Sequence, residues 1–308
     1  MSRSASRIST TVRTQLPLLA MRTRVVLGSA FDPAATLRRA GALFATPFRS
    51  SRSRALGAPT GDATCDSFEM DGHRIATYVW GDPARQPYVL FAHGWSSHGT
   101  RFLPWVPALR AAGYAVVAFD QPAHGRSTGE RTTLPDFACT LFAVAQRFGP
   151  AKAVVAHSLG GAAASVALAR GLRAERAVLI APAADPEAAA HRFARLIRLP
   201  ERLWRALIAS FENTVGVTFD ELQAHRTVPR IACPALIVHD VEDREVPWSE
   251  GERYARYWAD SRLLSTQGLG HNRIAGDAGV IDATLRFLRG ETVGDRVVSS
   301  PNLPYGFA

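Results

Sequence analysis

The clearest pattern in the chain is a series of short, continuous apolar runs separated by longer stretches with helical periodicity. The predicted strands are residues 88–92, 114–119, 151–156, 176–181, 235–239 and 262–266, and the predicted helices are residues 102–112, 134–148, 162–170, 249–258 and 276–288. Continuous apolar strands connected by helices indicate a mostly parallel sheet with helices on both faces. The fold class is therefore α/β.

Two further strands open this series. Residues 65–70 and 74–80 flank Asp71-Gly72, a strong signal for a tight antiparallel hairpin. We place the α/β core at residues 60–181 and 230–290, and we interpret residues 291–308 as a polar C-terminal tail.

Residues 182–229 interrupt the alternation, because they contain helical patterns and no predicted strand. Two apolar stripes have helical spacing, the first formed by Phe193, Leu196 and Ile197 and the second by Leu203, Trp204, Leu207, Ile208 and Phe211. A capping-box pattern at residues 218–221 predicts a third short helix. Ligands of such sheets bind beyond the carboxyl ends of the strands. We therefore expect a helical lid whose Phe193 and Trp204 contact substrate, with extra packing as the alternative.

Residues 1–59 form a basic N-terminal extension. Residues 1–57 hold ten arginines and one acidic residue, whereas the rest of the chain has 26 basic and 26 acidic residues. Asp32-Pro33 resembles an N-cap followed by proline at the first helical position, which predicts one amphipathic helix ending at Thr46-Pro47. We expect its apolar face to dock on the protein, with weak contact to a membrane surface as the alternative.

The composition sets further limits. The chain has 308 residues, of which 47% are hydrophobic and 20% are charged, as expected of one large soluble α/β domain. A basic extension on a neutral body argues against a nucleic-acid-binding core. The longest apolar stretch near the start, residues 16–21, is too short for a signal-peptide core or a membrane span. A transit peptide, or translation that begins at Met21, is an open alternative.

Three cysteines, Cys65, Cys139 and Cys233, show no CxxC spacing. Their pattern suggests neither a disulfide framework nor a zinc site. We expect a reducing, cytoplasmic location.

The candidate chemistry is centred on Ser158. The sequence Ala156-His157-Ser158-Leu159-Gly160 joins a predicted strand to a predicted helix, which is the context of a nucleophile elbow. The positions two residues before and after the serine must be small because the two backbones nearly touch there. Ala156 and Gly160 satisfy that requirement.

A serine hydroxyl needs a base to accept its proton and a third group to orient that base. His271 follows the last predicted strand within a glycine-containing loop, and Asp243 follows the strand before it. The order Ser158, Asp243, His271 is the order of an α/β-hydrolase triad. Asp240 and Glu242 lie beside Asp243 in sequence, so the identity of the acid stays open among them.

Two main-chain N–H groups are predicted to bind an oxyanion. One belongs to Leu159, directly after the serine at the start of a helix. The other belongs to Trp95, in the loop after the strand 88–92. We expect the indole of Trp95 to form a wall of the acyl pocket.

Four markers in order give the chain a specific resemblance. They are His93-Gly94-Trp95, the segment from Asp120 to Ser127, the elbow at Ser158, and the loops that carry Asp243 and His271. Over residues 65–290 the chain resembles α/β-hydrolase-fold serine hydrolases of the esterase and lipase kind. It departs from them at Ala156 and Ala123, where glycine is common, and at Asp240, which takes a place often held by glycine.

The resemblance bears on the acid and on the reaction. The spacing between Asp243 and Val246-Pro247 is similar to the spacing that follows the catalytic acid in this family, which favours Asp243. Asp185 is an outside candidate. The expected activity is hydrolysis of a hydrophobic carboxylic ester or thioester through an acyl-serine intermediate, without a metal ion or organic cofactor. An acyltransferase, perhydrolase or amidase with the same triad is one alternative. A non-catalytic ligand-binding member of the fold is another.

Overall fold

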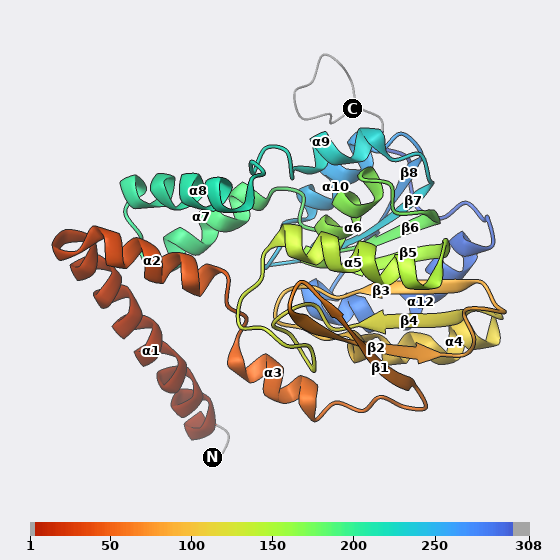
Figure 1. The fold of residues 1–308 in the computed structure, drawn as a ribbon, viewed down its shortest axis with the longest axis horizontal. Helices are drawn as coiled ribbons and strands as arrows, with labels where there is room; N and C mark the ends of the chain where they lie inside the picture. The colour runs from red at the N-terminus through yellow and green to blue at the C-terminus, as the bar shows by residue number, and fades with distance from the viewer. Residues whose placement is uncertain (1–3, 298–308) are drawn as a thin grey trace. The chain divides into compact units, whose positions relative to one another are not determined.

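An eight-stranded sheet forms the centre of the protein in the computed structural model, which describes residues 4–297 (Figure 1). Its strands are β1 (Thr64–Met70), β2 (His73–Trp80), β3 (Tyr88–Ala92), β4 (Ala115–Phe119), β5 (Ala151–His157), β6 (Ala174–Ile180), β7 (Ala235–Asp240) and β8 (Ser261–Thr266). The order in the sheet is β1-β2-β4-β3-β5-β6-β7-β8. β2 pairs antiparallel with both β1 and β4, and all other neighbours are parallel. The predicted α/β fold and its hairpin are confirmed.

The hairpin turn explains why β1 and β2 meet in register. Asp71 and Gly72 have φ values of 49° and 75°, so both central residues adopt the left-handed conformation that a tight two-residue turn requires. The turn pairs Met70 with His73 and continues to Thr64 opposite Val79.

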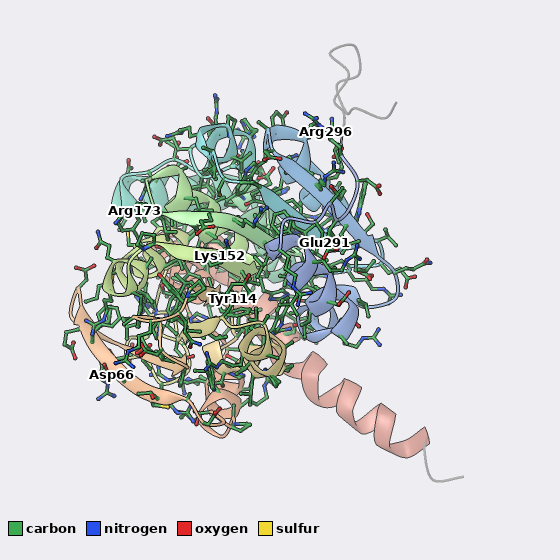
Figure 2. All side chains as sticks on the ribbon, turned by 90° about the vertical axis from the view of Figure 1, so that its right-hand side faces the viewer. Asp66, Tyr114, Lys152, Arg173, Glu291 and Arg296 are labelled. Carbon is green, nitrogen blue, oxygen red and sulfur yellow. The ribbon has the colours of Figure 1, made fainter. Side chains whose placement is uncertain are left out.

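Helices cover both faces of the parallel strands, as the continuous apolar runs predict. α5 (Leu134–Phe148) and α6 (Leu159–Ala169) lie on one face, and α4 (Val106–Ala111) and α12 (Ala278–Leu288) lie on the other (Figure 1). Every residue of β3, β4 and β7 is buried. α10 (Trp248–Tyr257) connects β7 to β8. Figure 2 looks toward the amino ends of the strands, where Tyr114, Lys152 and Arg173 are labelled, so the carboxyl ends lie at the opposite edge.

One predicted helix, residues 102–112, is divided. The structure has a 3-10 helix η1 (Gly99–Trp105) followed by the short helix α4. Pro104 and Pro107 explain the division, because neither can donate a main-chain hydrogen bond to the preceding turn.

The chain divides into two units, and residues 1–45 and 186–219 form the smaller, helical one. It contains α1 (Ser4–Phe31), α2 (Pro33–Phe44), α7 (Pro186–Ile197) and α8 (Glu201–Val215). α2 begins where the sequence predicts, because Asp32 accepts a hydrogen bond of 3.0 Å from the Ala35 N–H. The apolar face of α2 packs within this unit. Gly41 faces Leu207, and a Cβ at Gly41 would lie 3.3 Å from that side chain.

The expectation of a single helix in residues 1–59 is wrong, since α1 and α3 (Arg49–Leu56) are also present. Tertiary contacts rather than local signals explain both. Val25 of α1 is buried in a cluster with Ala40 and Ile197. Arg52 of α3 donates hydrogen bonds to the carbonyl oxygens of Ser127, at 2.5 Å, and Gly129, at 2.9 Å.

The third insertion helix starts later than predicted, as α9 (Ala224–Thr227) followed by η2 (Val228–Arg230). Residues 219–223 form turns instead, because the Phe219 N–H donates to the Glu212 carboxylate at 2.8 Å. The Asp220 carboxylate accepts a hydrogen bond of 2.8 Å from Arg226.

In the C-terminal tail, Asp295 forms a two-way main-chain bridge with Leu263 of β8. The rest of the predicted tail, residues 298–308, lies outside the described residues. Within residues 4–297, no helix is both long enough and apolar enough to cross a membrane.

Candidate active site

Ser158 stands at the carboxyl end of β5, on the turn into α6. Its backbone has φ 55° and ψ −123°, a strained conformation for a residue with a side chain. Close packing holds this turn in place. A Cβ at Gly160 would lie 2.5 Å from the Ala92 carbonyl oxygen, and one at Gly94 would lie 2.8 Å from the Ser158 Cβ. The small residues predicted around the serine are therefore required by the approach of strand, loop and helix.

Three predicted side chains meet at this edge of the sheet. The His271 Nε2 lies 2.9 Å from the Ser158 Oγ, and the His271 Nδ1 lies 2.7 Å from the Asp243 Oδ2. Asp243 comes from the loop after β7, and His271 from α11 (Gly270–Arg273) after β8. A proton on Nδ1 donates to the carboxylate and leaves the Nε2 lone pair directed at the serine hydroxyl, which is the arrangement of a general base.

The Asp243 carboxylate is buried and surrounded by hydrogen-bond donors. Its Oδ1 accepts from the N–H groups of Glu245 at 2.8 Å and Val246 at 2.9 Å. The His239 Nε2 lies 3.4 Å from its Oδ2. Burial by itself raises the pKa of Asp243, but the hydrogen bonds from His239, His271 and Val246 outweigh burial and hold this pKa well below its ordinary value. Asp243 is therefore ionised beside the imidazole.

The other candidate acids have different partners. Asp240 is fully buried and accepts hydrogen bonds from the Glu242 N–H at 3.0 Å, the Thr266 hydroxyl at 2.8 Å and the Leu269 N–H at 3.0 Å. It thereby ties the loop after β7 to the loop after β8. The carboxylate of Asp185 pairs with Arg253 at 3.0 Å. Of the four acids considered, only Asp243 is hydrogen-bonded to His271 in the described part of the chain.

Two buried histidines near the site have positioning contacts that the sequence analysis missed. The His157 Nε2 lies 2.8 Å from the main-chain oxygen of His271, and the two rings are 4.8 Å apart. Burial lowers the pKa of His157 well below its ordinary value, so the neutral ring donates to that oxygen. His239 donates to the Val246 carbonyl at 3.0 Å. Their signals were present, since His157 directly precedes Ser158 and His239 ends an apolar strand.

The two candidate oxyanion donors are main-chain N–H groups. Leu159 is the first residue of α6, so its N–H has no partner within the helix. Trp95 lies in the loop after β3, and its ring packs against Phe137 and His124. The ring therefore has neighbours in the α/β unit, and its contact with an acyl group stays a prediction.

Two neutral histidines hold the loop that carries Trp95. The His93 Nε2 accepts from the Gln121 N–H at 3.0 Å, and the His124 Nε2 accepts from the Ser96 N–H at 2.9 Å. In both rings the Nδ1 donates to a carbonyl oxygen. Burial lowers the pKa of each ring to about 3, which keeps the accepting lone pair free.

The segment from Asp120 to Ser127 anchors this loop in turn. The Asp120 carboxylate accepts hydrogen bonds from the Tyr78 hydroxyl at 2.6 Å and from the N–H groups of Gly99 and Arg126 at 2.7 Å each. Ala123 has φ 65°, so alanine adopts here the left-handed conformation that glycine adopts more readily. These contacts make the segment a scaffold for the site.

A hollow of about 270 Å³ opens beside His271. Its charged lining side chains are Glu242, Arg244, Glu245 and Arg273. This lining is too polar to be the acyl site that the apolar stripes of the insertion suggest.

Phe193 and Trp204 belong to the helical unit. Trp204 is buried there with its ring 5.3 Å from that of His191, and Phe193 packs 5.2 Å from Phe44. Leu196, assigned to the same stripe as Phe193, is 47% exposed. Both aromatic rings thus have partners within their own unit, and contact with substrate stays a prediction for them.

A mostly parallel sheet with a serine on a strained strand-to-helix turn, facing a histidine and an acid from later loops, defines the class of α/β hydrolases. The comparison with protein families agrees. The sequence model of the alpha/beta hydrolase family matches residues 89–283, and the chain belongs to that family.

Curated relatives include lipases. The chain is 31% identical over 194 residues to the lysophosphatidylserine lipase ABHD12 of Danio rerio, a match that covers 58% of this chain and 49% of the relative. It is 35% identical over 101 residues to a monoacylglycerol lipase of Mycolicibacterium smegmatis, covering 30% of this chain and 36% of the relative. The chain thus matches at most about half the length of these relatives.

Solved structures share the fold. A membrane phospholipase A described as a bacterial virulence factor superposes with a TM-score of 0.57 at 19% identity, covering 90% of this chain and 98% of that one. The thioesterase domain from the curacin biosynthetic pathway gives a TM-score of 0.56 at 19% identity, covering 74% of this chain and 100% of that one. At these identities the likeness supports the fold alone.

Proposed function

We propose that this protein is a serine hydrolase that cleaves a carboxylic ester or thioester through an acyl-serine intermediate. The observation that carries the proposal is the pair of contacts made by His271, 2.9 Å to the Ser158 hydroxyl and 2.7 Å to the buried Asp243 carboxylate. The names of the curated relatives, a lysophosphatidylserine lipase and a monoacylglycerol lipase, support an ester of a hydrophobic acyl chain.

Acylation begins with attack of the Ser158 Oγ on the carbonyl carbon, while the His271 Nε2 accepts the hydroxyl proton. The carbonyl oxygen becomes an oxyanion that accepts hydrogen bonds from the N–H groups of Leu159 and Trp95. Each such donor contributes about 10²–10³ in rate. Collapse of the intermediate breaks the bond to the leaving oxygen or sulfur, which takes the proton from His271 and departs as an alcohol or thiol.

Deacylation repeats these steps with water. His271 accepts a proton from the water as its oxygen attacks the acyl carbon. The bond to the Ser158 Oγ then breaks, and the serine regains its proton as the carboxylic acid leaves. Asp243 remains ionised throughout and stabilises the protonated imidazole.

Residues 182–229 are the proposed lid over this site. The support is their insertion directly after β6, at the edge of the sheet where ligands of this architecture bind. Phe193 and Trp204 are the proposed substrate contacts from the lid, and the indole of Trp95 is the proposed wall of the acyl pocket.

A fluorophosphonate probe followed by peptide mapping tests the nucleophile. We expect labelling of Ser158 and hydrolysis in a panel of esters and thioesters of increasing chain length. Ser158→Ala should abolish labelling and lower kcat by roughly 10⁶, as in triad deletions generally. Ser165→Ala is the matched control, because the Ser165 hydroxyl donates to Ala162 within α6. Near-normal esterase activity in Ser158→Ala would refute the assignment.

Two further readouts separate the alternatives. Trapping the acyl-enzyme and offering alcohols, amines or peroxide in competition with water would reveal a transferase, amidase or perhydrolase. Absence of labelling in a folded protein would favour a non-catalytic binding protein.

A further inference from the structure

Nearly all of the net charge of this protein lies in its smaller, helical unit. Residues 1–45 and 186–219 contain twelve arginines and four acidic residues, a formal charge of +8, whereas the whole chain carries +9. The α/β unit is therefore close to neutral. The charge is carried entirely by arginine, because the single lysine of the chain, Lys152, lies in β5.

The second half of α1 has two apolar faces. One face is buried, with Val25 in the cluster shared with α2 and α7. The other is exposed to solvent: Leu19, Val26, Leu27 and Phe31 are 58%, 48%, 54% and 85% exposed. Their positions i, i+7, i+8 and i+12 fall on one side of a helix. We call these four residues the outer face of α1.

The outer face of α1 is not the helix face that the sequence analysis considers for membrane contact, which is the apolar face of α2. The apolar side of α2 is already occupied, since Phe44 packs 5.2 Å from Phe193 and 6.2 Å from Phe211. Because that side is used inside the helical unit, it has no large apolar surface to offer to a membrane. The outer face of α1 has no such covering among the described residues, and its four members are among the most exposed apolar side chains there.

The helical unit also has exposed arginines. Arg24 of α1 and both Arg38 and Arg39 of α2 are exposed. Arg22 donates a 2.8 Å hydrogen bond to the main-chain oxygen of Leu196 on α7. An exposed apolar helix face in a unit rich in arginine is typical of a helix that lies in the interface of a bilayer, with apolar side chains among the acyl chains and cations at the phosphates.

We propose that the outer face of α1 docks the helical unit on a bilayer rich in anionic lipids. Charge complementarity selects this occupant. A second copy of the chain would bring together two units that each have a formal charge of +8, which Coulomb repulsion opposes. A nucleic acid would satisfy the arginines and leave the Leu and Phe side chains without a hydrophobic partner. An anionic bilayer offers phosphates to the arginines and acyl chains to the apolar side chains.

Sedimentation of the full chain with vesicles tests the proposal. The vesicles are phosphatidylcholine alone or an equal mixture with phosphatidylglycerol, at low and high salt. The apolar variant carries Leu19→Gln, Leu27→Gln and Phe31→Gln, and its control carries Leu56→Gln and Tyr257→Gln, two exposed apolar residues of the α/β unit.

The charge variant carries Arg24→Gln, Arg38→Gln and Arg39→Gln, and its control carries Arg170→Gln, Arg173→Gln and Arg289→Gln in the α/β unit. Circular dichroism and hydrolysis of a short water-soluble ester, with no vesicles present, report the fold and the active site of each variant independently of membrane binding.

We expect binding to the mixed vesicles only, weakened by high salt. The charge variant should lose about 100-fold in partition coefficient, since each arginine near such a surface contributes about fivefold. The apolar variant should lose at least about tenfold, and both controls should bind like the parent. Equal binding of the apolar variant, or equal binding to both vesicle types, would overturn the proposal. So would binding that depends on the arginines alone and is competed away by an oligonucleotide, or dimerisation that the apolar variant abolishes.

Discussion

The identity of the acid can be tested by comparing two aspartates only three residues apart. Asp243 accepts the hydrogen bond of His271 Nδ1, whereas Asp240 accepts three hydrogen bonds that join the two loops of the site. Asparagine has nearly the shape of aspartate, so each substitution changes charge and hydrogen bonding with little change in packing. The two variants should therefore fail in different ways.

In Asp243→Asn, the NH₂ group can take the place of the oxygen that faces His271 Nδ1. The ring would then carry its proton on Nε2, toward the Ser158 hydroxyl, and could not accept the serine proton. The expected loss in kcat is about 10⁴, with a smaller change in KM. This loss should appear in a protein that remains folded.

In Asp240→Asn, the amide oxygen can still accept from Thr266 and Leu269, but the NH₂ group then faces the Glu242 N–H. One partly buried donor is left unpaired, at a cost of about 1 kcal/mol in the free energy of unfolding. Because His271 keeps its own partners, kcat should stay within about tenfold of the parent.

Steady-state ester hydrolysis and urea unfolding, measured on the same preparations, separate the two outcomes. The reasoning would be refuted if Asp240→Asn lowered kcat by about 10⁴ at unchanged stability while Asp243→Asn remained active. That result would show that Asp240 supplies the charge felt by the imidazole.

Two further predictions concern stability and the elbow. Burial lowers the pKa of His93 and of His124 to about 3, so between pH 6.5 and pH 3 the unfolded chain binds protons that the folded protein does not. The free energy of unfolding should therefore be highest above pH ~6.5 and fall toward pH 3, with a loss of about 2 kcal/mol per ring at pH 5. Urea unfolding at pH 7.5 and pH 5 measures this difference, and equal midpoints would contradict it. Gly160→Ala should cost about 3 kcal/mol and most of the activity, because its Cβ would lie 2.5 Å from the Ala92 carbonyl oxygen. Gly276→Ala is the matched control, since a Cβ added there would meet no atom of another part of the fold within 4 Å. A similar loss in both variants would contradict the close packing proposed for the turn at Ser158.

Local rules in the sequence were sufficient for the framework of this protein. Alternation of apolar runs and helical stripes predicts the parallel sheet, and Asp71-Gly72 predicts the hairpin, because side-chain periodicity and the left-handed turn are properties of neighbouring residues. The small residues around Ser158 predict the strained turn for the same reason. The order of serine, acid and histidine, together with the spacing from Asp243 to Val246-Pro247 that resembles the family, selected the three side chains that the structure brings into contact.

Only the tertiary structure decided which partner each group meets. In sequence, only the spacing to Val246-Pro247 favours Asp243 over Asp240, whereas in the structure their roles separate because Asp240 faces Thr266 and Asp243 faces His271. The helix α1 and the docking of α2 on α8 depend on contacts between residues about 170 positions apart, for which no local signal exists. The same packing covers one apolar face and leaves another exposed. Whether a helix face is buried depends on which elements lie next to it in space, and local sequence patterns do not determine those elements.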